Sequence, residues 1–339
     1  MQNRPVSNPL QNLCMNASEP RRTVLAVMLS LGLPGAAWAQ PAWPERPITL
    51  VVPFGPGGIA DLTARIVAQA MSTTLKVPII IDNKPSAGSI VGSAAVAQAA
   101  PDGYTLLLMS NANAVSAGLF KKIPFDVQKD FAPVGLLGVF DLALFVGAES
   151  KLKSVRELVE QAKARPGKLT IGTIAVGSTQ NLSAELFKAR TGIDALIVPY
   201  KGSPAVLTAL RAGEIDAAFE ILGPMLPQLQ AKVVRALAVT SDRRFVALPD
   251  VPTMREAGVA DYEVASWNAL AAPAKTPSAV IERLNAAAND ALKMPAVQER
   301  LLALGVRAQG GTPQQLQALL ARETRHWGEV IRAAKIEPE

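Results

Sequence analysis

The chain has 339 residues, of which 49% are hydrophobic, 18% charged and 5% aromatic, and its formal net charge is +6. These values are typical of a globular protein of about two domains, and they exclude a disordered chain, a collagen and a disulfide-rich scaffold. The single cysteine and the single histidine exclude an intramolecular disulfide, a cysteine zinc site and a multi-histidine metal site. The basic residues are not clustered and aromatic residues are few, so we expect anionic ligands rather than nucleic acid, and neither a metal nor a cofactor.

The first 39 residues have the layout of a secretory signal peptide. An arginine pair at positions 21–22 precedes an apolar run at 24–33, which is followed by Ala37-Trp38-Ala39. We predict cleavage after Ala39 and export to the periplasm, which leaves a mature chain without cysteine. Two points stay open: whether translation starts at Met1 or at Met15, and whether the arginine pair directs twin-arginine export.

The mature chain alternates predicted strands and helices. Apolar runs predict strands at residues 48–52, 77–81 and 104–109, and helical periodicity predicts helices at 59–75 and 89–99. After a transition near 131–145, strands are expected at 169–174, 196–198, 215–219 and 235–240, and helices at 154–165, 179–190, 203–212 and 224–231. From residue 277 the pattern is almost entirely helical, over 277–293, 295–304 and 313–334.

Repeated strand–helix units predict an α/β fold whose sheets are mostly parallel and flanked by helices. A helical tail with few strands does not make a third α/β domain, so we expect it to pack on the first half of the chain. Two lobes result, with crossovers near residues 140 and 265. The first comprises residues 40–140 and 265–339, and the second comprises residues 141–264.

Common catalytic signatures are missing from the sequence: it has no G-x-S-x-G, H-E-x-x-H, Walker A or C-x-x-C motif. We therefore expect a binding protein without catalytic residues. One alternative is a dinucleotide-binding oxidoreductase, because residues 55–60 (Gly-Pro-Gly-Gly-Ile-Ala) fit G-x-G-x-x-A between a strand and a helix. Asp82 then ends the next strand at the spacing of a ribose-binding acid. The export signal and the stiff Pro56 weigh against this alternative.

The glycine loop can hold an anion without any dinucleotide. Gly57 and Gly58 open a helix, where unpaired backbone N–H groups and the helix dipole favour negative charge and no side chain blocks a close approach. Asp61, in the first turn, either caps the helix or takes part in binding. Loops at the ends of other predicted strands are expected to face the same crevice; they cover residues 110–113, 175–180, 199–203 and 220–223. Ser178 and Thr179 begin a helix and offer a second anion-binding N-terminus.

Several motifs are similar to those of the Bug family of solute-binding proteins, and together they span essentially the whole mature chain. They lie at residues 43–48 (Trp-Pro-Glu-Arg-Pro-Ile), 51–58 with Asp61, 100–104 (Ala-Pro-Asp-Gly-Tyr), 198–203 (Val-Pro-Tyr-Lys-Gly-Ser), 235–240, 248–253 and 310–313. The resemblance implies a type II periplasmic binding protein, a two-lobed flytrap that closes on a di- or tricarboxylate, an acidic amino acid or an aromatic acid. It also implies a monomeric receptor that serves the membrane subunits of a tripartite tricarboxylate transporter.

The candidate ligand-binding residues are Phe54, Gly57, Gly58, Asp61, Ser110, Asn111, Gly177, Ser178, Thr179, Tyr200 and Glu220. The sequence departs from the family pattern at two loops. Residues 177–181 read Gly-Ser-Thr-Gln-Asn where the family often has Gly-Ser-x-x-His, and residues 219–221 read Phe-Glu-Ile where it often has Phe-Asp-Asn. The identity of the ligand therefore stays open, and Glu220 either pairs with a ligand amine or is a structural acid bonded to backbone.

Overall fold

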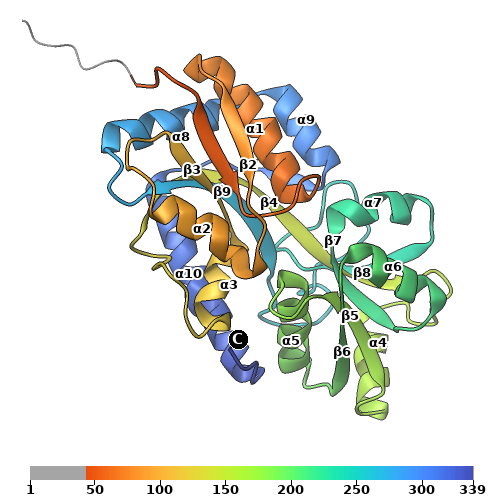
Figure 1. Cartoon of the computed structure of the whole chain (residues 1–339). Helices are drawn as coiled ribbons and strands as arrows, with labels where there is room; N and C mark the ends of the chain where they lie inside the picture. The colour runs from red at the N-terminus through yellow and green to blue at the C-terminus, as the bar shows by residue number, and fades with distance from the viewer. Residues whose placement is uncertain (1–42, 339) are drawn as a thin grey trace, which may run out of the picture. The chain divides into compact units, whose positions relative to one another are not determined.

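One long strand, β4 (Phe131–Gly147), belongs to two sheets in the computed structural model, which describes residues 43–338. Residues up to Asp141 pair with β9 (Ala265–Pro273), and residues 142–145 pair with β7 (Ala217–Ile221). The chain thus passes from one sheet to the other along β4 (Figure 1). The predicted signal peptide and its cleavage site lie outside the described residues.

The first sheet is mixed. Its strand order is β2-β1-β3-β9-β4, and β10 pairs with β4. β1 is parallel to β2 and β3, whereas β9 is antiparallel to both β3 and β4. The bounds of the strands not yet given are β1 Ile48–Val52, β2 Ile79–Asn83, β3 Thr105–Ser110 and β10 Val306–Ala308.

The second sheet repeats this plan with the order β4-β7-β5-β6, and β8 pairs with β4. β5 is parallel to β6 and β7, while β7 and β8 are antiparallel to β4. The remaining bounds are β5 Leu169–Ile174, β6 Ala195–Tyr200 and β8 Val234–Val239. The predicted parallel pairing therefore holds within each strand–helix repeat, and antiparallel strands join the repeats to β4.

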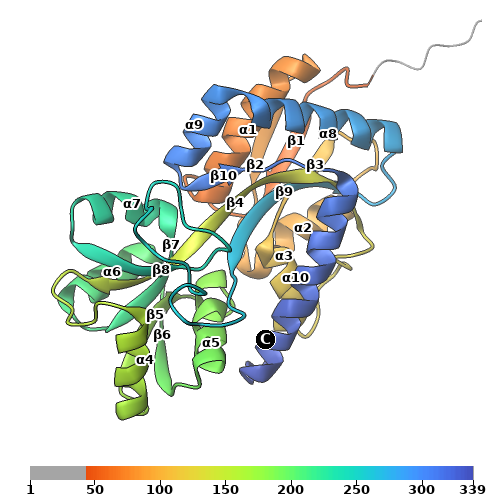
Figure 2. The same ribbon diagram turned by 180° about the vertical axis from the view of Figure 1, so that it is seen from behind.

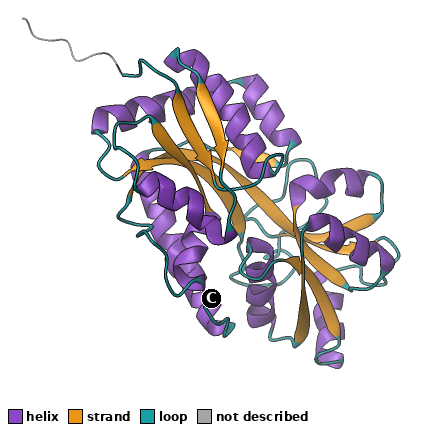
Figure 3. Ribbon diagram, in the orientation of Figure 1, coloured by secondary structure: helices purple, strands orange, loops and turns teal. Residues whose placement is uncertain are grey.

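Helices cover both faces of each sheet (Figure 3). On the first sheet, α1, α8 and α9 pack on one face and α2, α3 and α10 on the other, and α6 and α7 lie opposite α4 and α5 on the second sheet. Their bounds are α1 Ile59–Leu75, η1 Ala87–Ser89, α2 Ile90–Ala97, α3 Asn111–Leu119, α4 Val155–Ala164, α5 Thr179–Thr191, α6 Ser203–Ala212, α7 Leu222–Gln230, α8 Ser278–Lys293, α9 Pro295–Ala303 and α10 Pro313–Ala333.

The C-terminal helices return to the first sheet, as their composition predicted. α8 packs on α1 and β4, and α10 packs on α3 and β4 (Figure 2). α10 begins with a capping box in which Thr312 and Gln315 bond each other's backbone N–H, and Pro313 occupies the first turn. α10 also contacts α5, so the last helix touches elements of both sheets.

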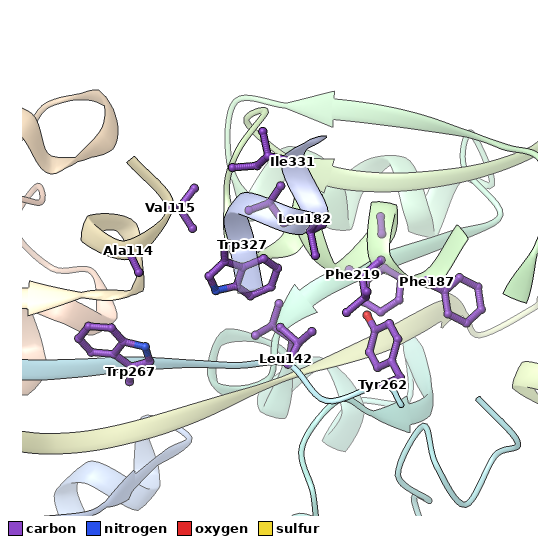
Figure 4. Close-up of a cluster of buried hydrophobic side chains, with 14 of the residues drawn as sticks. Ala114, Val115, Leu142, Leu182, Phe187, Phe219, Tyr262, Trp267, Trp327 and Ile331 are labelled. Atoms are coloured by element: carbon purple, nitrogen blue, oxygen red, sulfur yellow. The ribbon is translucent and has the colours of Figure 1, made fainter. Parts of the chain in front are cut away.

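A single apolar cluster connects the two sheets. It contains Ala114 and Val115 of α3, Leu182 of α5, and Trp327 and Ile331 of α10, and each of these side chains is buried (Figure 4). α3, α5 and α10 therefore pack together, and their packing holds the loops at the strand ends of the two sheets near one another.

Three elements differ from the sequence prediction. The supposed transition near 131–145 is strand β4, residues 265–273 form β9, and α3 (Asn111–Leu119) begins inside the loop predicted at residues 110–113. β4 and β9 are buried almost throughout, so they lack the alternation of a half-exposed strand. Nevertheless, the α/β fold with two sheets flanked by helices is confirmed.

Candidate functional site

The loop after β1 presents the uncapped start of α1. Gly57 has a φ of +85°, which favours glycine, and Gly58 occupies the N-cap with an extended φ of −78°. No side chain within residues 43–338 caps this helix. The backbone N–H groups of its first turn therefore remain available to an anion, and the helix dipole favours negative charge there.

The buried carboxylate of Asp61 fixes the conformation of this loop through hydrogen bonds. Its Oδ2 accepts hydrogen bonds from the Gly57 N–H and from Arg65 Nε, both at 2.9 Å, and its Oδ1 accepts one from Asn83 Nδ2 at 2.9 Å. Asn83 Nδ2 also donates to the Phe54 carbonyl at 3.0 Å. Only 1% of Asp61 is exposed. Its carboxylate therefore supports the loop, and the Gly57 N–H is already bonded.

These contacts also set the ionisation of Asp61. Burial by itself would raise the pKa of this carboxyl, but hydrogen bonds from Arg65, Gly57 and Asn83 outweigh burial and hold the pKa of Asp61 below its ordinary value. The group is therefore charged at neutral pH, at the positive end of α1.

The loop after β5 is built in the same way. Gly177 has a φ of +76°, and its N–H donates to Asn181 Oδ1 at 3.1 Å, four residues further on, as Gly57 donates to Asp61. Ser178 Oγ accepts the Asn181 N–H at 3.1 Å and caps α5. One repeat thus supports its glycine turn with a carboxylate and the other with a neutral amide. Asn181, at the position of the family histidine, has a structural role here.

Two predicted residues join the sheets directly. Asn111 Nδ2 donates to Thr179 Oγ1 at 3.0 Å, and Asn111 Oδ1 accepts the Trp327 indole N–H at 2.9 Å. A side chain at Gly177 would clash with Leu119 of α3, so the loop after β5 lies against the first sheet's helices. Ser110 caps α3 and is also bonded locally. The structure therefore brings Ser110, Asn111, Gly177 and Thr179 to one place.

Glu220 is the next-to-last residue of β7 and is fully buried. Its Oε2 accepts hydrogen bonds from Ser203 Oγ at 2.8 Å, from the Ile221 N–H at 3.2 Å and from Gln180 Nε2 at 3.4 Å, while its Oε1 has no partner among the described residues. Burial raises the pKa of Glu220, and these three hydrogen bonds oppose the rise only in part. One oxygen is thus held by neighbouring residues, and the other has no hydrogen-bond partner among residues 43–338.

The remaining predicted residues also lie at strand ends. Phe54 follows β1 and packs against the core beneath α1, and Tyr200 ends β6 in register with Ile174 of β5. Sequence reasoning did not assign Arg65 and Asn83, which hold the first loop, and it left the role of Asn181 open. The spacing Gly-x-x-x-Asp and Gly-x-x-x-Asn after two strands was the available signal. Asp82, the candidate ribose-binding acid, is paired with Lys84 at 3.0 Å.

Within residues 43–338, no group of three or more His, Cys, Asp or Glu side chains lies close enough together to hold a metal ion. In the same part of the chain no helix combines the length and the apolar character needed to cross a membrane.

Residues 63–336 match the family model described as tripartite tricarboxylate transporter family receptor. The chain belongs to this receptor family. Among curated relatives, Protein BugT of Bordetella pertussis is 36% identical over 311 residues, which cover 91% of this chain and 95% of BugT. A protein named for the tcbD-tcbE intergenic region of Pseudomonas sp. (strain P51) is 38% identical over 314 residues, 92% of this chain and 94% of its own length. The resemblance to Bug proteins is confirmed.

Solved structures agree with this assignment. The periplasmic binding protein BugD superposes with a TM-score of 0.75 at 31% identity, covering 88% of this chain and 100% of its own. R. palustris Rpa4515 with adipate gives 0.78 at 35% identity, over 88% and 100% of the two chains. MatC from Rhodopseudomonas palustris with bound malate gives a TM-score of 0.73 at 32% identity, over 85% of this chain and 99% of MatC. This tripartite tricarboxylate transporter receptor thus shares the fold of periplasmic solute-binding proteins. The family and these neighbours are binding proteins, and none of these matches supports the oxidoreductase alternative.

Proposed function

We propose that this receptor captures a small carboxylate between the loops after β1 and β5 and does not transform it chemically. The observation that carries the proposal is the uncapped start of α1, whose glycine turn is fixed by Asp61 and left open to an anion. Gly58 supplies backbone close to the ligand because it has no side chain and its N-cap position adjoins the first free N–H groups. The neighbours whose structures were solved with adipate and with bound malate support a carboxylate as the ligand class.

In this proposal each predicted residue has a definite part. Gly57 shapes the first turn, and Asp61 holds it without touching the ligand. Ser178 and Gly177 form the second turn, Ser110 caps α3, and Thr179 and Asn111 bond each other where the loops meet. Glu220 offers Oε1, and Phe54 and Tyr200 flank the loops.

The two lobes move about β4 and the segment before β9. We place their division at residues 40–140 with 265–339 and 141–264. The change of β4 partners between Asp141 and Leu142, and the start of β9 at Ala265, support these boundaries. Export with cleavage after Ala39, a monomeric receptor and delivery to the transporter's membrane subunits complete the proposal.

Isothermal titration of the protein purified from periplasmic extract tests the ligand class. The probes are adipate, malate, succinate, citrate, glutamate and nicotinate, with NAD as the control for the oxidoreductase alternative. We expect saturable binding of at least one carboxylate and none of NAD. Binding of NAD alone, or a protein that binds none of these acids after its co-purified ligand has been removed by unfolding and refolding, would refute the proposal. Mass spectrometry of the same preparation should show an N-terminus at Gln40.

A further inference from the structure

Asn268 has a buried side-chain amide. It lies in β9, 1% of it is exposed, and neither its Oδ1 nor its Nδ2 has a hydrogen-bond partner among residues 43–338. Buried polar groups in proteins are nearly always bonded, because burial without a partner costs free energy. An amide with both ends unpaired therefore calls for a functional explanation.

The strand register places Asn268 at the proposed site. Asn268 pairs with Ser110, the last residue of β3 and the N-cap of α3. β3 in turn pairs with β1, with Leu107 opposite Val51, so the end of β3 adjoins the loop that follows β1. Asn268 is thus in line with the strand ends that carry the predicted ligand loops.

The side chain of Asn268 lies on the face that α1 covers. Side chains alternate along a strand, and Leu270, two residues on, packs in the same cluster as Ala64 and Val67 of α1. Thr63 of α1 is also fully buried, and its Oγ1 likewise has no partner in the described part of the chain. The helix that covers this face of the sheet therefore also carries a buried polar group without a partner among residues 43–338.

The amide restricts the chemistry of what it binds. A carboxylate only accepts hydrogen bonds and an ammonium only donates them, so each would leave one end of Asn268 unpaired. A hydroxyl both accepts and donates. We infer that Asn268 is a specificity-determining residue that binds the hydroxyl of a hydroxy-carboxylate, an inference that rests on the carboxylate-binding function proposed above.

Malate and succinate test this inference, because they differ by one hydroxyl. We expect titration calorimetry to give about 10- to 100-fold tighter binding of malate by the wild type, since succinate leaves the buried amide unpaired. In Asn268→Leu, whose side chain has nearly the same shape, the ratio should fall to within about threefold of one, with a melting temperature equal to or above that of the wild type.

Asn285→Leu is the matched control. Asn285 of α8 is fully used, since its Nδ2 donates to the Val134 carbonyl at 2.8 Å and to the Gly311 carbonyl at 2.7 Å. This variant should melt at a lower temperature and keep the wild-type ratio. Asn268→Ala serves as a second variant if Asn268→Leu does not fold.

The outcomes separate the two proposals. If carboxylates bind but the wild type does not distinguish malate from succinate, or if the Asn268 variants keep the preference, the role of Asn268 is refuted while the receptor function stands. If no carboxylate binds, both proposals fail.

Discussion

Replacing Asp61 should lower the free energy of unfolding of the receptor. The size of the loss depends on the hydrogen bonds that this carboxylate accepts. Asp61→Ala leaves the Gly57 N–H and Asn83 Nδ2 without their acceptor. Hydrogen bonds to a charged group contribute about 1.5–3 kcal/mol each, so we expect the free energy of unfolding to fall by about 3 kcal/mol at pH 7. The half-exposed Arg65 adds little to this sum, because surface ion pairs are weak.

Asp61→Asn should cost less, about 2 kcal/mol, because the amide oxygen keeps the bond to the Gly57 N–H, whereas the amide NH2 cannot accept the hydrogen bond of Asn83 Nδ2. Asn181 already serves Gly177 in this way in the second repeat. Urea denaturation followed by circular dichroism measures both variants, with Asn181→Ala as the control that removes an uncharged acceptor.

Acid should remove the difference between the wild type and Asp61→Asn. The pKa of Asp61 is lowered in the folded state, so the charge stabilises the fold above the ordinary carboxyl pKa of about 3.9. This stabilisation is lost as the pH falls through the lowered pKa of the folded state. A difference that grows on acidification, or Asp61→Ala and Asp61→Asn of equal stability, would refute the structural role of this carboxylate.

Three other predictions follow from single contacts. Gly58→Val should fold normally and lose ligand binding in calorimetry, since its Cβ meets only the Gly55 carbonyl at 3.8 Å, whereas Gly57→Val should lower the melting temperature because of the φ of +85°. Glu220→Gln should be more stable than the wild type at pH 8, because burial raises the pKa of Glu220 in the folded state. Urea titrations should show this difference shrink as the pH falls through the raised pKa. The difference should vanish below about pH 4, where the acid is protonated in both the folded and the unfolded state. Trp327→Phe should cost about 1–2 kcal/mol more in thermal unfolding than Trp267→Phe, because both rings are buried but only the Trp327 indole N–H has partners, Asn111 and Glu323.

The strand–helix repeats could be predicted closely because their signals are local. Apolar runs and capping residues mark β1, α1, β5, α6 and the three C-terminal helices within one or two residues of their observed bounds. β4 and β9 could not be predicted in this way. Their residues are buried by pairing partners more than seventy positions away, as Phe145 is by Ala218 and Phe131 by Pro273, and no local period reports such pairing.

The same division between local and distant signals runs through the site. The glycine turns and the helix starts are local, so Gly57, Gly58 and Ser178 were found in the sequence. The part played by Asp61 depends on Asn83, which the parallel pairing of β1 and β2 brings to the loop with Asn83 opposite Val52. The position of Asn268 depends on strands that lie further apart in the sequence, because Asn268 pairs with Ser110, which stands 158 positions earlier. Residues that fix a turn can therefore be found from spacing alone. Asn268, which we propose discriminates between ligands, reaches this end of the sheet through the strand register, which only the three-dimensional structure shows.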